Sequence, residues 1–274
     1  IWACVGRDGG KDSFASAVAT HAALRDYSPY LRPGERVCVL ALAVSREQAQ
    51  VAHGYICGNF LETPALRALV ANETQDGLAL KNRVDIVIST NDFRSIRGRT
   101  VACAVMDECA FYRSADSASP DKELYAALRP SLARIPDSIL LGISTPYRRD
   151  GLFYDRVTNH YAGDGTILVV KGGTVLFRPD FPRDIIGDAL ADDPQSALSE
   201  YGDLDGNIRF RDDLSSFIDR AMVDAAIDRG VYVRQPNPNI QHVGFVDSSS
   251  GRGDSFTLAI AHAEGHLLIV DCVR

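Results

Sequence analysis

No run of apolar residues in this sequence approaches the roughly 18–20 residues that a membrane-spanning helix needs, so we expect no membrane segment. The first residues have neither a basic start nor a long apolar core, and we expect no secretory signal peptide. The chain begins without Met, on an apolar segment, and we therefore expect it to be part of a longer protein. Its 274 residues, 46% hydrophobic and 24% charged, are typical of a globular protein with one large domain or two small ones.

Paired cysteines are also missing. The six cysteines form no CxxC motif and mostly lie in apolar runs, so we expect buried free thiols rather than a disulfide framework or a metal set. The histidines show no metal-ligand spacing, and we expect them to be structural or exposed. They are His21, His53, His160, His242, His262 and His266.

An excess of positive charge is absent too, because the net charge is −7, and this argues against wholesale coating of nucleic acid. The acid is concentrated between positions 179 and 230, where thirteen acidic residues face five basic ones, a balance of −8. The rest of the chain therefore carries −7 + 8 = +1, and a local DNA-binding face is not excluded.

The first part of the sequence alternates short apolar runs with helix-like segments. The runs "IWACV", "ERVCVLALAV", "RVDIVIST", "RTVACAVMDE" and "DSILLGIST" predict buried strands. The segments "SFASAVATHAALRDY", "REQAQVAHGYICGNFLE" (with Ser45 as its cap) and "DKELYAALRPSLARI" predict helices between them. This alternation predicts an α/β fold, a parallel sheet covered by helices on both faces.

The pattern changes after the segment "RRDGLFYDRVTNHYAG". "TILVVKGGTVLFRPD" predicts a hairpin around Gly172 and Gly173. "DDPQSALSEYG" and "SSFIDRAMVDAAIDRG" predict short helices, and "RQPNPNIQ" a linker. The last 33 residues predict a strand, a loop, a strand, a turn at Glu264–Gly265 and a third strand.

A glycine-rich loop follows the first predicted strand in "ACVGRDGGKDSF". Gly9 and Gly10 allow close backbone approach to phosphates, the helix end is positive, and Lys11 can reach the terminal phosphates. The GxxxxGK[ST] pattern is incomplete, because Val5 and Asp12 stand at its first and last positions, and a simple glycine turn is the alternative. The predicted nucleotide-binding residues are Gly6, Arg7, Asp8, Gly9, Gly10, Lys11, Asp12 and Ser13.

Asp12 stands where such loops carry the Ser or Thr that binds Mg²⁺. A carboxylate is also a hard oxygen ligand, so Asp12 is a candidate metal ligand, with its charge compensated by Lys11 and Arg7. Ser13 is the alternative ligand if the register slips. The competing interpretation is that Asp12 only caps the following helix.

The predicted strand "TVACAVM" ends in Asp107–Glu108. Asp107, a carboxylate at a strand end, can hold the coordination shell of Mg²⁺. The next residue, Glu108, can orient and deprotonate the attacking water. A solvated turn is the structural alternative. With a phosphate loop about a hundred residues upstream, the pair favours a nucleotide site with ATP and Mg²⁺.

Five segments, in this order, resemble the large terminase subunits, the DNA-packaging motors of tailed bacteriophages and prophages. They are "GRDGGK", "FRSIRGRTVACAVMDECAFY", "LLGISTPYRRDGLFYD", "DDPQSALSEYG" and "VGFVDSSSGRGDSFTLAIA". The resemblance implies a P-loop NTPase (RecA/ASCE-like) domain over residues 1–178 with its first part missing, an acidic connector over 179–240, and the start of an RNase H-like nuclease domain over 241–274.

The resemblance also implies roles for single residues. Arg7 would stabilise charge on the transferred phosphoryl group, and Ser144 and Thr145 would sense the γ-phosphate and couple its loss to neighbouring elements. Without the resemblance, "STP" indicates only a strand end before a Pro turn. Arg94, Arg97 and Arg99 could contact DNA, act on a neighbouring subunit or line a solvated loop; the sequence favours none of the three.

For the nuclease, the resemblance implies that Asp247 is the first ligand of two Mg²⁺ or Mn²⁺ ions. Asp254 is a possible helper or a turn residue, and Asp271, inside a strand, is expected to be structural. The other acidic ligands of the family are not present before Arg274, so we expect little or no DNA cleavage by this chain alone.

The partners implied by the resemblance are double-stranded DNA, a portal protein and a small terminase subunit. The resemblance also implies a homo-oligomeric ring docked on the procapsid in the cytoplasm of the infected bacterium. Two alternatives stand beside this hypothesis: a helicase-like translocase, for which no second motor motif follows Gly172, and an inactive prophage remnant that only binds partners. Asp12 supports the second.

Overall fold

The computed structural model describes residues 1–74, 77–90, 96, 98–112, 120–213, 225–247 and 256–274. It divides into two compact units: Ile1–Arg113 with Ser119–Ser215, and Ser216–Arg274 with Ser114–Ala118. In the part of the chain it describes, no helix combines the length and apolar character needed to cross a bilayer. The predicted boundaries at 178 and 240 stay predictions.

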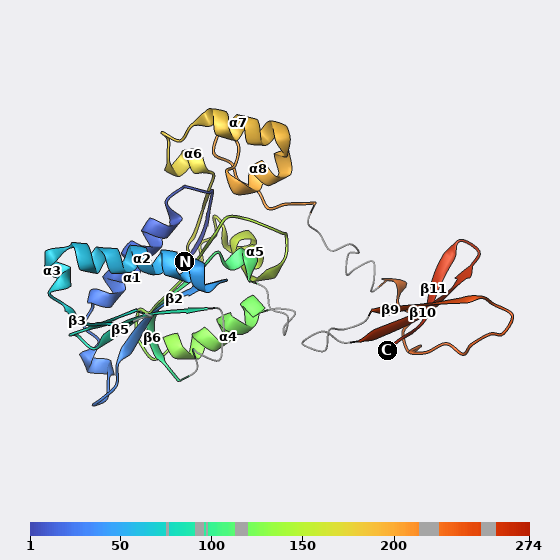
Figure 1. The fold of residues 1–274 in the computed structure, drawn as a ribbon, viewed down its shortest axis with the longest axis horizontal. Coiled ribbons are helices and arrows are strands. Elements are labelled where there is room, and N and C mark those ends of the chain that lie inside the picture. Colours follow the sequence, from blue (N-terminus) through green and yellow to red (C-terminus); the bar gives the residue numbers. More distant parts are fainter. Residues whose placement is uncertain (75–76, 91–95, 97, 113–119, 214–224, 248–255) are drawn as a thin grey trace. The chain divides into compact units, whose positions relative to one another are not determined.

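An eight-stranded sheet forms the centre of the first unit, in the order β3-β4-β5-β2-β6-β7-β1-β8 (Figure 1). From β5 to β8 all neighbouring strands run parallel, as predicted. An antiparallel hairpin, β3–β4, extends the sheet beyond β5 and was not predicted. The strands are β1 (Trp2–Val5), β2 (Val37–Ala43), β3 (Val70–Thr74), β4 (Gly77–Leu80), β5 (Val84–Thr90), β6 (Thr100–Asp107), β7 (Ile139–Ser144) and β8 (Val169–Gly172).

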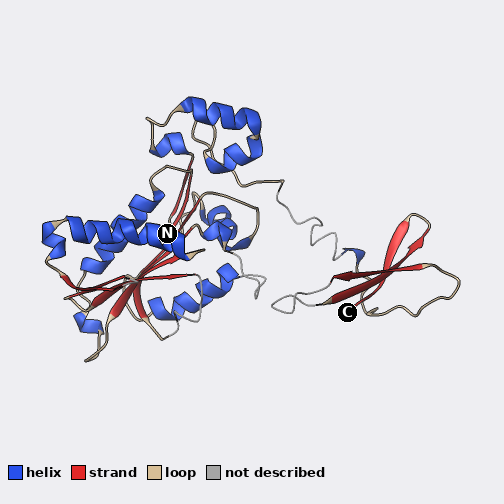
Figure 2. Cartoon of the chain, viewed as in Figure 1, coloured by secondary structure: helices blue, strands red, loops and turns tan. Residues whose placement is uncertain are grey.

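Helices cover both faces of this sheet (Figure 2). On one face lie α1 (Lys11–Leu24) and α2 (Arg46–Glu62), followed by the short α3 (Pro64–Arg67). Small residues of α1 at helical spacing, Ala15, Ala19 and Ala22, are buried, and they pack in one core cluster with Val39 of β2 and Phe60 of α2.

The opposite face carries α4 (Pro120–Leu132) and α5 (Gly151–His160). Leu124 and Leu128 of α4, Phe153 of α5 and Trp2 of β1 belong to a second buried cluster. The continuous apolar strands therefore have a hydrophobic core on each side, which confirms the predicted α/β class.

The helix starts follow local capping rules. Ser45 caps α2 as predicted, since its Oγ accepts a hydrogen bond from the Gln48 amide at 3.3 Å. Asp193 does the same for α8 (Pro194–Glu200), where its carboxylate accepts from the Ser196 amide at 3.0 Å.

The predicted hairpin around Gly172–Gly173 is wrong. β8 instead pairs in parallel with β1, and the chain turns into α6 (Thr174–Phe177), before α7 (Arg183–Asp192) and α8. Gly173 serves a close backbone approach: its amide donates to the Gly206 carbonyl at 2.7 Å, and a Cβ on Gly173 would lie 2.7 Å from the Tyr201 carbonyl oxygen. Two glycines therefore gave a local turn signal for what is a long-range contact.

The second unit contains an antiparallel sheet in the order β11-β10-β9 (Figure 1). The predicted turn is confirmed, with Gly265 in the left-handed region at φ 60°. The predicted helix over 215–230 lies largely outside the described residues, whereas residues 234–241 form neither helix nor strand. The strands are β9 (His242–Asp247), β10 (Thr257–Glu264) and β11 (Leu267–Val273).

All six cysteines are free thiols, as predicted. Cys272 is partly exposed, and the other five are buried. Burial raises the pKa of Cys4 and Cys103 to about 12, so these thiols remain protonated.

Candidate nucleotide site

A loop of five residues, 6–10, joins β1 to α1 at the carboxyl edge of the sheet. Gly10 occupies the N-cap position of α1 in a left-handed conformation, φ 79°, which glycine adopts without steric cost. The Gly9 amide donates to the Gly6 carbonyl at 3.0 Å and tightens the loop. Strand, tight loop and helix start thus form the backbone arrangement that the sequence predicts for phosphate binding.

The loop is held by segments far away in the sequence. A Cβ on Gly6 would lie 2.6 Å from both the amide nitrogen and Oγ1 of Thr174, so only glycine fits here. Thr174 Oγ1 donates to the Arg7 carbonyl at 2.6 Å, and the Arg7 amide donates to the Glu200 carbonyl at 2.6 Å. The contacts of Thr174 and Glu200 with this loop were not predicted, because nothing local marks a contact across such a sequence distance.

The acidic pair lies at the end of β6, and a single strand, β7, separates β6 from β1. The carboxyl ends of parallel strands meet at one sheet edge, and Lys11 Nζ accordingly lies 2.9 Å from Glu108 Oε1. Glu108 has φ 48°, a left-handed conformation that is uncommon outside glycine. The structure therefore brings together Lys11 and the Asp107–Glu108 pair, which are about a hundred residues apart in the sequence.

Ser144, the last residue of the intervening strand β7, contacts this pair. Its Oγ donates to Glu108 Oε2 at 3.0 Å and accepts from the Ala110 amide at 3.4 Å. Ser144 and the neighbouring Thr145 are both buried. Glu108 is thus held at both carboxylate oxygens, by Lys11 and by Ser144, while the coupling roles of Ser144 and Thr145 stay predictions.

Negative charge is crowded at this edge. Burial, and then repulsion by Asp12 and Glu108, raises the pKa of Asp107 to about 7. Burial and the carboxylates of Glu108 and Asp8 also raise the pKa of Asp12, although Lys11 opposes this. Burial tends to lower the pKa of Lys11, but attraction by Glu108 and Asp12 outweighs it and the pKa is raised. Lys11 therefore stays charged, whereas Asp12 and Asp107 are harder to ionise than ordinary aspartates.

Asp12 lies in the first turn of α1 and is half-buried. The N-cap position belongs to Gly10, and no side chain in this part of the described chain caps α1. The helix-cap interpretation of Asp12 is therefore not what the structure shows. Ser13 and Asp8 are exposed on the same loop and helix start.

The side chain of Arg7 pairs with α8 and not with the acidic pair. Its side chain is 61% exposed, and its Nη1 lies 3.3 Å from Glu200 Oε2 of α8. The residues predicted to bind nucleotide thus lie on the loop 6–10 and in the first turn of α1, and Arg7 pairs with Glu200, an acid outside the predicted set.

The donor set fits a divalent cation. Buried Asp107 Oδ1 has no hydrogen-bond partner among the described residues, which is costly for a carboxylate oxygen unless a ligand satisfies it. Asp12 and Asp107 add hard oxygen atoms of the kind that Mg²⁺ prefers. A cation held by these carboxylates would weaken the repulsion that adds to burial in raising the pKa of Asp107.

The predicted nuclease residues lie in the other unit. Asp247 ends β9 and is exposed. Asp254 lies outside the described residues, as do Arg94 and Arg97. The guanidinium of Arg99 donates to Cys38 Sγ at 3.8 Å, and its predicted roles are untested.

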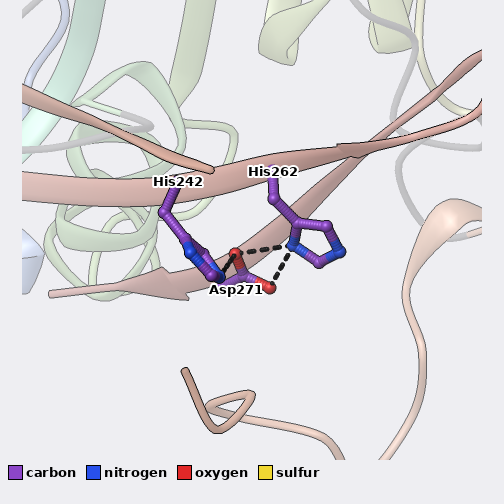
Figure 3. A group of neighbouring side chains, drawn as sticks. All are labelled: His242, His262 and Asp271. Atoms are coloured by element: carbon purple, nitrogen blue, oxygen red, sulfur yellow. Dashed lines mark hydrogen bonds and ion pairs between the residues drawn. The ribbon is translucent and has the colours of Figure 1, made fainter. Parts of the chain in front are cut away.

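Two of the histidines lie close to one carboxylate, and the expectation that the histidines are structural or exposed stays a prediction. His242 and His262 lie with Asp271 in one group, in which each residue offers a ligand atom within 4.8 Å of the others (Figure 3). Neighbouring positions in the sequence do not show this, because the three residues meet only through strand register. The side chain of His53 is outside the described part.

No protein-family model and no curated protein sequence matches this chain. Solved structures do match. The large terminase of bacteriophage HK97 has a TM-score of 0.57 and 16% identity over 97% of this chain, and this chain spans 57% of the HK97 protein. The large terminase ATPase domain of Thermus phage P74-26 has a TM-score of 0.54 and 18% identity, covering 73% of this chain and 86% of that domain. The chain therefore has the fold of phage large terminases, which confirms the resemblance at the level of the fold; the RNase H-like part stays a prediction.

Proposed function

We propose that this chain is the ATP-hydrolysing motor part of a phage or prophage large terminase. One observation carries the proposal: Lys11, at the start of α1, lies 2.9 Å from Glu108, which directly follows Asp107 at the end of β6. The shared fold with the P74-26 ATPase domain supports it. Phosphoryl transfer to water requires a loop that holds the phosphates, a positive charge beside them and acidic residues for the metal ion and the water. The glycine-rich loop, Lys11 and Asp107–Glu108 can provide these groups.

In this proposal Lys11 exchanges partners. Without nucleotide its ammonium neutralises Glu108; with ATP bound it contacts the terminal phosphates. Glu108 is then released from its cation while Ser144 still holds its other oxygen, so the free carboxylate oxygen orients water and accepts a proton from it. Mg²⁺ held by Asp107 and Asp12 would supply charge neutralisation on the phosphate oxygens.

Arg7 is suited to stabilise the transferred phosphoryl group. Exposed ion pairs contribute only about 0–1 kcal/mol to stability, so its pairing with Glu200 can be given up at little cost. A guanidinium presents several donors to phosphate oxygens in a fixed geometry.

The test is ATP hydrolysis by this chain with Mg²⁺, together with equilibrium binding of nucleotide. Lys11→Ala should lose both binding and hydrolysis. Glu108→Gln should still bind nucleotide but hydrolyse it about 10²–10⁴-fold more slowly, because general-base catalysis contributes that much. Glu123→Gln, an exposed acid on α4, is the matched control and should behave as wild type.

Equal inactivity of the wild type and both site variants would contradict the proposal and favour an inactive remnant. Hydrolysis that survives Glu108→Gln would show that the base is another group.

The wider assignment rests on the family resemblance. We propose double-stranded viral DNA as the translocated substrate, with a portal protein and a small terminase subunit as partners. We also propose a ring of identical subunits on the procapsid in the infected cell, and a metal-dependent nuclease site that includes Asp247 and Asp254. Stimulation of ATP hydrolysis by double-stranded DNA tests the first of these; no response at any DNA length would count against it.

A further inference from the structure

The described part of the second unit has an unusual distribution of burial. The only buried side chains in residues 225–247 and 256–274 are His262, 9% exposed, and Asp271, 6% exposed. Large apolar side chains of the same strands are exposed, including Phe245 at 68% and Leu268 at 82%. Burying polar groups is unfavourable unless partners satisfy them. The centre of this sheet is therefore a polar arrangement that needs an explanation.

Strand register assembles the group from three strands. His242 of β9 lies directly opposite His262 of β10, and the two rings are 5.4 Å apart. Between β10 and β11 the register shifts, with Ile260 opposite Cys272 and Ala261 opposite Val270.

The residue skipped by this shift is Asp271. A bulge of this kind re-aims a side chain, and here it accompanies a carboxylate that meets the histidine pair. Figure 3 shows the carboxylate lying between the two imidazole rings.

The interatomic distances suit a small cation. His262 Nδ1 lies 2.9 Å from both oxygens of Asp271, and His242 Nε2 lies 3.7 Å from Asp271 Oδ2. Zinc bonds of about 2.0–2.1 Å place tetrahedral ligands about 3.4 Å apart, which falls between these two distances. Small side-chain movements would therefore bring all three ligand atoms to bonding distance.

A further carboxylate lies behind one imidazole. His262 Nε2 is 3.9 Å from Glu264 Oε1, on the side of the ring away from Asp271. Metal-bound histidines commonly donate their second ring N–H to a carboxylate, which fixes the tautomer and strengthens the ligand. Nδ1 donates to the Asp271 carboxylate, so a metal on Nδ1 would take the place of that proton, and the neutral ring would then carry its proton on Nε2, facing Glu264.

We propose that His242, His262 and Asp271 form a binding site for a Zn²⁺-class divalent transition metal. Two imidazole nitrogens and one carboxylate oxygen match the preference of such ions, whereas Mg²⁺ prefers oxygen alone. Three protein ligands leave a fourth position for water or another group. The ion would join three adjacent strands, so its binding would also stabilise the second unit.

This site is separate from the predicted nuclease residue on the same strand. His242 and Asp247 are five residues apart, which is about 17 Å along a strand, and an odd separation places them on opposite faces of the sheet. The inference therefore does not depend on the proposed motor or nuclease function.

The experiment is Zn²⁺ binding to the whole 274-residue chain in excess Mg²⁺, which occupies hard oxygen sites, with the bound metal measured after equilibrium dialysis. We expect one Zn²⁺ per chain. His242→Ala should weaken binding by more than about 100-fold, beyond the loss typical for an outer partner. His266→Ala, an exposed histidine at the β10–β11 turn, is the matched control and should bind as wild type. Glu264→Gln should weaken binding by about 10-fold.

Substitution with Co²⁺ reports the ligands directly. We expect the visible absorption of tetrahedral Co²⁺ without a thiolate charge-transfer band, and no change in Cys272→Ser. Asp271→Asn should abolish the signal; if that variant does not fold, His242→Ala decides, since its side chain is 23% exposed. No stoichiometric Zn²⁺ on the wild type, unaltered binding by His242→Ala, or a thiolate band lost in Cys272→Ser would each overturn the proposal.

Discussion

Asp107→Asn should stabilise the metal-free protein while abolishing the proposed ATP hydrolysis. Burial and the neighbouring carboxylates raise the pKa of Asp107 from its ordinary 3.8 to about 7. A difference of about 3 units, at about 1.4 kcal/mol per unit, corresponds to about 4 kcal/mol of unfavourable free energy for the ionised residue in the folded state. Asn removes the charge and keeps the shape, so the free energy of unfolding should rise by up to about this amount at pH 8.

The pH dependence gives the sign of the effect. In the folded state Asp107 keeps its proton up to about pH 7, whereas in the unfolded chain it loses the proton above its ordinary pKa of 3.8. Between these values the folded state binds more protons, so its contribution to stability falls as pH rises. The gain from Asp107→Asn should therefore be near zero at pH 4 and reach its full size above pH 7.

Urea unfolding of the wild type and Asp107→Asn, at pH 5 and pH 8 in EDTA, measures this difference. Asp164→Asn, an exposed loop acid, controls for a generic Asp-to-Asn effect. Mg²⁺ should stabilise the wild type more than the variant, because the ion relieves the same repulsion. A variant that is less stable than wild type at pH 8, or a difference independent of pH, would refute the electrostatic account of this site.

Three further predictions concern the same edge of the sheet. Ser144→Ala removes the hydrogen bond to Glu108 Oε2 and should lower kcat for ATP by about 10- to 100-fold with little change in KM, since hydrogen bonds to charged groups contribute about 1.5–3 kcal/mol. An unchanged kcat would show that Ser144 does not position Glu108. Gly6→Ala should destabilise the fold by about 1–3 kcal/mol, because the added Cβ overlaps with Thr174. Gly187→Ala, in open space on α7, should instead stabilise it by about 0.5–1 kcal/mol. Urea unfolding measures both free energies, and equal effects would contradict the steric argument. Chelation of Mg²⁺ should abolish ATP hydrolysis and re-addition should restore it; hydrolysis that persists in EDTA would argue against a metal-dependent site.

Much of the fold and of the site follows from local sequence patterns. Apolar runs of strand length alternate with helical segments, and a parallel sheet places the ends of its strands at one edge. Lys11, Asp107 and Ser144 each follow or end such a run. Their position at one edge of the sheet could therefore be predicted from the order of elements, whereas their contacts depend on the strand order β6-β7-β1, which the structure shows.

Contacts that depend on strand register or on distant segments could not be predicted in this way. Gly172–Gly173 has the composition of a turn, but Gly173 allows the close approach of the backbone at Gly206, more than thirty residues later in the chain. The β3–β4 hairpin is short, and its first strand is largely exposed, so it lacks the apolar pattern that marks the other strands. His242 and Asp271 lie on the two strands that flank β10, and a one-residue shift in the β10–β11 register brings them together. The spacing of these residues in the sequence does not indicate this contact.

Asp12 shows how one residue alters the electrostatics at the start of α1, next to the glycine-rich loop. The first turn of a helix favours a carboxylate, and Lys11 adds attraction, yet the pKa of Asp12 is raised because burial and the repulsion from Glu108 and Asp8 are stronger. The same carboxylate helps to raise the pKa of Asp107. A hydroxyl at this position would offer a metal ligand without either effect. With Asp12 a second carboxylate helps to raise the pKa of Asp107, so we expect the binding of a divalent cation here to depend more strongly on pH than it would with a hydroxyl at this position.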